Sequence, residues 1–144
     1  METLRKSGEF ERVRREGRSW GTPLLVLNAA RSDQGSVRCG FITGKKVGNA
    51  VTRNRARRLI REAVRLRLPL LQPGWDLVWI ARAALPEADY AAVAGAVDDL
   101  LKRARLFQPG ALETAQSQSR LIGMGTPESG TLPAQQETGT ARQP

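Results

Sequence analysis

The chain of 144 residues contains no histidine and a single cysteine, Cys39. Histidine is the commonest general acid–base group and metal ligand, so its absence removes most familiar catalytic sites. One cysteine without histidine supplies neither a zinc site of ordinary spacing nor a Cys–His nucleophile. No internal disulfide can form, which is typical of a reducing cytoplasm. We therefore expect no catalytic residue, no protein metal site and a cytoplasmic location.

Long apolar runs are also missing. The longest uncharged run in the first 106 residues, 19–30, is too short to span a bilayer. No apolar stretch follows the N-terminus, so no secretory signal is expected. These features argue against a membrane partner.

Apolar residues become scarce after position 106, where Gly, Pro, Gln, Ser and Thr dominate. A segment of this composition buries too little surface to offset the entropy lost on ordering. We predict one folded domain over residues 1–106 and a disordered tail over 107–144.

Acidic residues are few relative to basic ones: 14 against 23, for a net charge of +9. Such an excess on a small domain attracts polyanions, with nucleic acid as the partner that fits best and an anionic membrane surface as the second candidate. Arginine outnumbers lysine by 19 to 4, which suits phosphate because the guanidinium binds it bidentately. A GC-rich genome would also raise the arginine content, but it does not explain why the arginines cluster.

Hydrophobic periodicity predicts an α+β domain. Ser7 is a candidate helix cap and Gly17 a candidate helix end, while Asn49 and Asp89 are candidate caps for two later helices. Pro69 should end the second helix. Over 20–30 the pattern fits either one long strand or two short ones. The expected order is α-β-β-(β)-α-β-α, with helices near 7–17, 49–68 and 89–104 and strands near 24–27, 37–43 and 75–81.

The most basic segment reads KKVGNAVTRNRARRLIRE over 45–62. Its apolar residues recur at helical spacing and predict one buried stripe, while arginines four apart form a second face. Like charges at this spacing repel, so the face indicates a polyanionic ligand rather than a solvated surface. The residues expected to contact nucleic acid are Lys45, Lys46, Arg53, Asn54, Arg55, Arg57, Arg58, Arg61 and Arg65.

Other candidate sites are weaker. The sequence Gly44-Lys45-Lys46 lacks the first glycine and the Ser/Thr of a P-loop, so we expect no nucleotide-binding site and no small-molecule substrate. Asp98 and Asp99 are adjacent on a predicted helix and should diverge. Phe10 is either a core residue or a platform on which bases stack, whereas Trp75 and Trp79 fit a core strand.

The basic segment closely resembles the protein subunit of bacterial ribonuclease P. The match is long and ungapped, with basic residues followed by GNAV, RN, two adjacent basic residues and Arg-Glu. Weaker matches at Phe10, at Arg38 with Gly40 and at Ile80 with its neighbours extend the resemblance over residues 4–106. The residues that carry the main match are Lys45, Lys46, Gly48, Asn49, Ala50, Val51, Arg53, Asn54, Arg57, Arg58, Arg61 and Glu62.

The resemblance implies a small two-layer α/β sandwich with a left-handed βαβ crossover, contrary to the usual hand. It further implies an enzyme that removes the 5′ leader of precursor tRNA, with Mg²⁺ bound mainly by a catalytic RNA subunit. The arginine helix would dock on that RNA, and a cleft would hold the leader. Phe10, Arg14 and Asn28 occupy the cleft positions, although Arg14 stands where the family usually has a second aromatic residue, and an aromatic residue is common near Asn28.

Three other functions fit the basic composition. A general RNA-binding module of ribosomal type would lack a catalytic partner. A DNA-binding regulator would place the arginine helix in a major groove, typically as a dimer. A self-sufficient nuclease would cleave without any RNA subunit.

Overall fold

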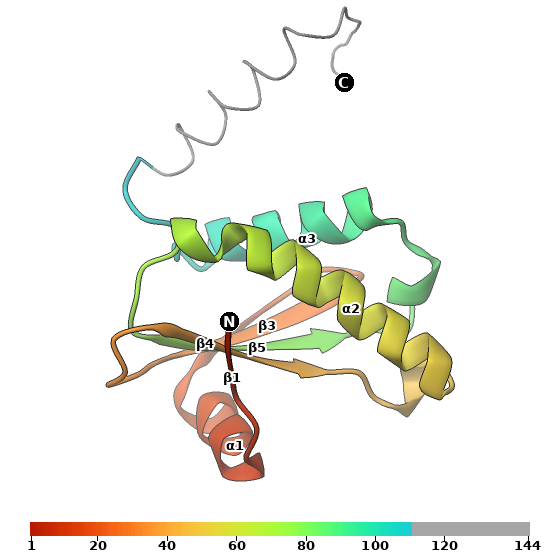
Figure 1. Ribbon diagram of the computed structural model, residues 1–144, viewed down its shortest axis with the longest axis horizontal. Coiled ribbons are helices and arrows are strands. Elements are labelled where there is room, and N and C mark those ends of the chain that lie inside the picture. Colours follow the sequence, from red (N-terminus) through yellow and green to blue (C-terminus); the bar gives the residue numbers. More distant parts are fainter. Residues whose placement is uncertain (111–144) are drawn as a thin grey trace, which may run out of the picture. The chain divides into compact units, whose positions relative to one another are not determined.

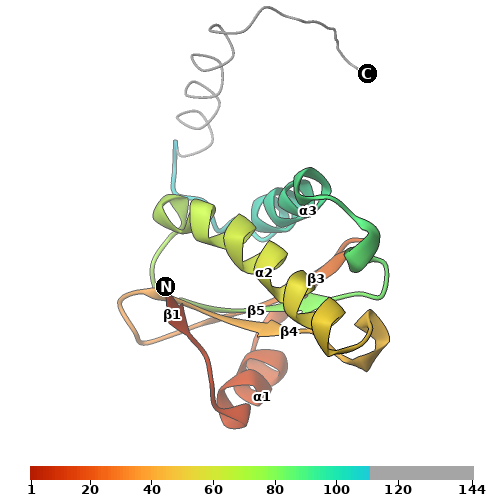
Figure 2. The ribbon, with the colours of Figure 1, turned by 45° about the vertical axis from the view of Figure 1, so that its right-hand side comes forward.

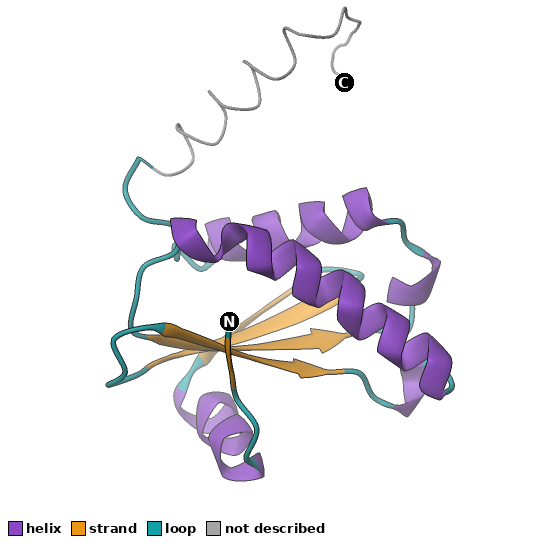
Figure 3. Cartoon of the chain, viewed as in Figure 1, coloured by secondary structure: helices purple, strands orange, loops and turns teal. Residues whose placement is uncertain are grey.

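A computed structural model describes residues 1–110, of which Met1–Gln108 form one compact unit. Figure 3 shows its helices and strands. The elements are β1 (Glu2–Thr3), α1 (Ser7–Glu16), β2 (Arg18–Gly21), β3 (Leu25–Arg31), β4 (Val37–Ile42), the 3₁₀ turn η1 (Lys45–Val47), α2 (Ala50–Arg67), η2 (Leu68–Leu70), β5 (Trp75–Ala81), η3 (Leu85–Glu87) and α3 (Tyr90–Arg103).

The five strands form one mixed sheet in the order β1-β4-β5-β3-β2. Strands β4 and β5 are parallel, whereas β3 is antiparallel to both β5 and β2. Helices α2 and α3 lie over one face of the sheet, and α1 lies on the opposite face (Figure 1). The expected α+β sandwich is confirmed, and α1 covers part of the face that α2 and α3 leave open.

The connection from β4 through α2 to β5 has the unusual hand that the resemblance implied. Both strands point to the right in Figure 1, β4 lies nearer the viewer than β5, and α2 runs back above them. The view turned by 45° shows the same arrangement (Figure 2). A chain that follows this path makes a left-handed turn, whereas most such crossovers are right-handed.

Strand alternation divides the apolar core between the two sheet faces. Leu27, Leu77 and Trp79 are fully buried beneath α2 and α3. Val13 of α1 and Val78 of β5 belong to a smaller cluster on the opposite face. Trp79 is thus a core residue, as predicted. Trp75 is half-buried at the margin of the same cluster as Trp79.

Helix ends agree with the sequence at four of the five predicted positions, and α2 ends at Arg67, just before Leu68 and Pro69. The side chains of Asn49 and Asp89 accept hydrogen bonds from the backbone N–H groups of Thr52 and Ala92, each at 2.9 Å. Gly17 ends α1. The prediction for Ser7 was wrong by one residue, because Lys6 is the cap and Ser7 begins the helix.

Two strand details could not be settled from the pattern. The segment 20–30 contributes to two strands, β2 and β3, separated by a turn in which the Thr22 N–H bonds to the Leu25 carbonyl. Strand β1 was not predicted, because two residues carry no measurable periodicity. It pairs with β4 through Glu2 and Thr3.

The folded body extends two residues beyond the expected end at 106. Phe107 bridges to Leu71, and the Gln108 N–H bonds to the Leu70 carbonyl at 2.8 Å. Most of the predicted tail, residues 111–144, lies outside the described residues.

Candidate nucleic-acid interface

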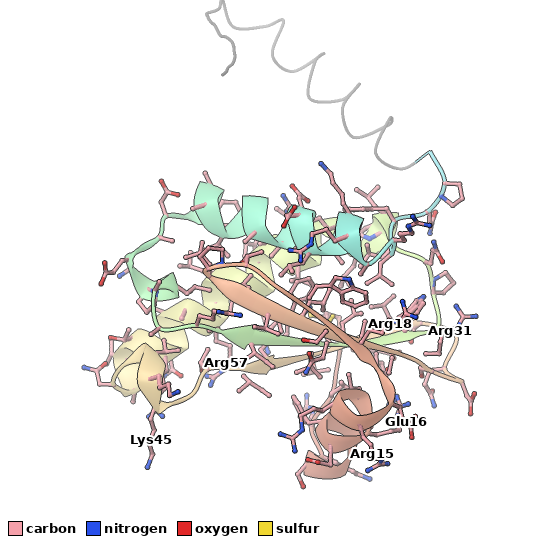
Figure 4. All side chains as sticks on the ribbon, turned by 180° about the vertical axis from the view of Figure 1, so that it is seen from behind. Arg15, Glu16, Arg18, Arg31, Lys45 and Arg57 are labelled. Carbon is pink, nitrogen blue, oxygen red and sulfur yellow. The ribbon has the colours of Figure 1, made fainter. Side chains whose placement is uncertain are left out.

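A tight turn brings two lysines to the start of α2. Gly48 has φ of 146°, a conformation that side chains rarely adopt, and a Cβ there would lie 2.9 Å from Thr52 Cγ2. The turn leaves Lys45 and Lys46 exposed just before the helix N-terminus. Figure 4 shows Lys45 extending away from the body. Positive charge therefore gathers where the helix dipole also favours anions.

Four of the predicted residues meet on one side of α2. They surround a shallow depression of about 280 Å³, and we call them the cationic face: Asn54, Arg57, Arg58 and Arg61. The buried side of the same helix is formed by Ala56, Ile60, Ala63 and Val64. The helix thus has the core stripe and the cationic side that its sequence predicted.

Strand β4 and the residue that follows it hold two of these arginines in place. Arg57 donates from Nη2 to Thr43 Oγ1 at 2.7 Å and from Nη1 to Asn54 Oδ1 at 3.0 Å. The Arg61 guanidinium lies over the ring of Phe41, 5.7 Å from its centroid. These contacts fix the positions of the two guanidinium groups without neutralising their charge. The sequence pattern did not reveal this role of Thr43 and Phe41, although both belong to the alternating strand pattern.

The remaining predicted contacts are placed differently. Arg55 leaves α2 about 160° around the helix from Arg57, so it does not join the cationic face. Arg65 bonds to Glu62 one turn earlier, and this bond holds the pKa of Glu62 below its usual value. Arg53 is half-buried at the first turn. Contact with RNA stays a prediction for all three.

Several acidic side chains form ion pairs with arginines outside the cationic face. Glu9 and Asp76 pair with Arg38, Asp98 pairs with Arg67, and Asp99 pairs with Arg103. Among residues 1–110, the Arg65–Glu62 pair is the one that brings a carboxylate to a predicted contact residue of the segment 45–65. The positive charge of this surface is therefore almost uncompensated within the described part of the chain.

Asp76 is the most buried of these acids, with no exposed surface. It accepts from Arg38 Nε at 2.9 Å and from Arg38 Nη2 at 2.7 Å, and Arg12 of α1 donates to the same carboxylate. The Asp76 hydrogen bond raises the pKa of Arg38. This cluster joins α1 to β4 and β5, because Asp76 of β5 pairs with one arginine on α1 and another on β4.

Carboxylates do not gather into a metal site in the region described. No three Asp, Glu or Cys side chains of residues 1–110 are close enough together to hold a metal ion. Asp98 and Asp99 diverge toward Arg67 and Arg103, as their adjacency predicted. None of the helices in this region is long and apolar enough to cross a membrane.

The predicted cleft residues lie on the face of the sheet that carries α1. Phe10 is half-buried, with its ring against Gly40 of β4. Arg14 follows one turn later on the same flank of α1, is largely exposed and pairs with Glu11 at 2.7 Å. Asn28 is 8% exposed on β3, on the side of the sheet that also carries Ala30. Arg14 and Asn28 share no hydrogen bond in the described structure, so their joint role in a cleft stays a prediction.

Comparison with known proteins decides between the functions considered above. The sequence model of the ribonuclease P family matches residues 1–105. The chain belongs to the ribonuclease P protein family. It is 48% identical over 112 residues to the ribonuclease P protein component of Roseiflexus castenholzii, covering 77% of this chain and 92% of that protein. It is 44% identical over 104 residues to the component from Herpetosiphon aurantiacus, covering 72% and 85%.

Solved ribonuclease P proteins share the fold. The Staphylococcus aureus protein superposes with a TM-score of 0.69 at 26% identity, over 75% of this chain and 99% of that one. The Thermotoga maritima protein gives 0.65 at 30% identity, over 72% and 97%. The chain is therefore a protein component of ribonuclease P, an RNA-based enzyme of tRNA processing with a catalytic RNA partner. A general RNA-binding role without that partner is not favoured.

Proposed function

We propose that the cationic face, together with Lys45 and Lys46, docks on the catalytic RNA of ribonuclease P. The uncompensated charge of this surface is the observation that carries the proposal. Phosphate groups supply the missing counter-charge, and the positions of Arg57 and Arg61 are fixed before binding, which lowers the entropy lost on complex formation.

We also propose that the flank of α1 bearing Phe10 and Arg14 grips the 5′ leader of precursor tRNA. The ring of Phe10 is only half-buried, so a base can stack on its open side. Arg14 adds charge where the family commonly has an aromatic residue, so phosphate contact contributes more here and stacking less. Asn28 offers a side-chain amide to the same RNA leader.

The protein then reduces phosphate repulsion between two RNA molecules and lengthens the grip on the substrate. Mg²⁺ at the catalytic centre would be held mainly by the RNA subunit, because most acids of residues 1–110 pair with arginines and no three of them group for a metal. The work takes place in the cytoplasm, which the single cysteine suits. No membrane and no small-molecule substrate are involved.

Reconstitution tests this function directly. Precursor tRNA is incubated with Mg²⁺ and the full chain, with and without a bacterial ribonuclease P RNA, at an ionic strength at which the RNA alone is slow. We expect 5′ cleavage only when the RNA is present, and faster cleavage when the chain is added. Cleavage by the chain alone, or no effect of the chain, contradicts the proposal.

The leader assignment needs its own comparison. Phe10→Ala should weaken binding of precursor tRNA by about 1–3 kcal/mol, the usual value of one stacked base. Binding of mature tRNA should not change, because it lacks the leader. Equal losses for both ligands would remove Phe10 from the leader site.

A further inference from the structure

A second cationic surface lies far from the cationic face. Arg18 of β2 and Arg31 of β3 border a groove of about 290 Å³, which is also lined by Trp20 and Trp75. Figure 4 shows Arg18 and Arg31 on the opposite side of the molecule from Lys45 and Arg57. Strand β2 is one edge of the sheet, whereas the cationic face lies over β4 near the other edge.

The charge of this groove is unbalanced. Neither Arg18 nor Arg31 pairs with a carboxylate of residues 1–110. Glu16 is the one acid among the described residues that line the groove. It is already held by Arg12 at 3.0 Å and by Arg15 at 3.6 Å. An anion entering the groove would therefore meet net positive charge.

The groove also offers flat surfaces. The Arg31 guanidinium lies over the Trp75 ring, 5.1 Å from its centroid, so the ring supports a planar cation at the rim. Bases of single-stranded RNA stack on such guanidinium planes and on aromatic rings, while nearby arginines bind the phosphates. The volume is at the lower limit of small-ligand sites, which suits a single base.

We propose that this groove binds an unpaired nucleotide in the upstream part of the precursor tRNA leader. Stacking needs an unpaired base, and the leader is a single-stranded segment of the substrate. The catalytic RNA is assigned to the opposite edge of the sheet, which leaves this edge to the second RNA. Arg31 supplies the stacking plane and Arg18 the phosphate contact. The proposal rests on the proposed leader grip and extends it beyond Phe10.

The test uses holoenzyme reconstituted with the RNA subunit and two precursor tRNAs. One has a leader just long enough to reach Phe10, and the other continues well upstream. The variant Arg18→Ala with Arg31→Ala should lower affinity for the long-leader substrate about tenfold, because it removes one stacking interaction and one phosphate-binding group. Affinity for the short-leader substrate and for the RNA subunit should not change.

Two comparisons separate stacking from charge. Arg31→Lys keeps the charge but removes the planar group, so most of the stacking contribution should still disappear. Abasic upstream nucleotides should weaken binding to the wild-type holoenzyme and make it insensitive to Arg31→Lys. Lys102→Ala is the control for charge alone, because Lys102 leaves α3 about 160° around the helix from Ala104 in the groove wall.

The outcomes distinguish this proposal from the one on which it rests. Equal losses for both leaders, a loss of affinity for the RNA subunit, or no loss at all would overturn the groove assignment. A wild-type holoenzyme that binds precursor and mature tRNA equally well would instead overturn the leader grip itself.

Discussion

The ring of Phe10 lies so close to Gly40 that a Cβ at position 40 would be 2.4 Å from Phe10 Cε1. This packing places α1 against β4 and fixes the aromatic residue proposed to hold the leader. Gly40→Ala should therefore move the ring or the helix. We expect a loss of about 1–3 kcal/mol in the free energy of unfolding, measured by urea denaturation.

A double variant tests the cause of that loss. Adding Phe10→Ala to Gly40→Ala removes the ring that the new methyl group meets. The two effects should then be non-additive, with the double variant more stable than the sum of the single changes predicts. Strict additivity would show that the two residues do not interact.

The cationic face should appear in the salt dependence of binding to the catalytic RNA. Arg57→Ala with Arg61→Ala should lower affinity and reduce the slope of log K against log salt by about 0.7–0.9 for each phosphate group that is no longer neutralised. Arg103→Ala is the matched control, because Arg103 is paired with Asp99 on α3. If the double variant and the control have the same slope, the face does not bind RNA.

The hydroxyl of Thr43 should matter to the same binding reaction without touching RNA. Thr43→Val keeps the shape but removes the oxygen that accepts the hydrogen bond from Arg57. Affinity for the catalytic RNA should fall by about 0.5–1.5 kcal/mol, the usual value of one hydrogen bond, while the salt slope stays the same. Thr3→Val in β1 is the control, and an equal loss there would point to a general effect on the fold.

Asp76 should be among the most important polar residues for stability. Asp76→Asn leaves Arg12 and Arg38 facing each other without their shared anion, at an expected cost of about 3 kcal/mol. Asp98→Asn breaks a pair whose carboxylate is 39% exposed, so it should cost about 1 kcal/mol or less. Guanidinium denaturation of both variants gives the comparison, and equal costs would refute the special role of Asp76.

Burial raises the pKa of the Cys39 thiol from 9.0 to about 12. The thiol should therefore resist alkylation at pH 8 in the folded protein and react readily in urea, where it is exposed. Because folding favours the protonated thiol, its contribution to stability is complete below pH 9 and is lost as the pH rises toward 12. Rapid labelling under native conditions would contradict this burial.

Much of the site was predictable because its determinants are local. The Asn49 side chain caps α2 by accepting a hydrogen bond from the N–H three residues later. The apolar stripe that includes Ile60 follows directly from helical spacing. The same spacing aligned Arg57 with Arg61. Absences were equally informative, since a chain without histidine pointed to chemistry supplied by a partner.

Sequence alone thus determined the helix and its charge, and it predicted a polyanionic partner. The tertiary structure decided which residues of other elements contact the helices, because those contacts join distant positions. Arg57 of α2 and Thr43 are 14 residues apart, and Asp76, which binds Arg12 of α1, lies 38 residues from Arg38 and 64 from Arg12. Periodicity reports which side chains share a face of one element. It carries no information about which face of another element they meet, and that depends on the sheet order and on the left-handed crossover.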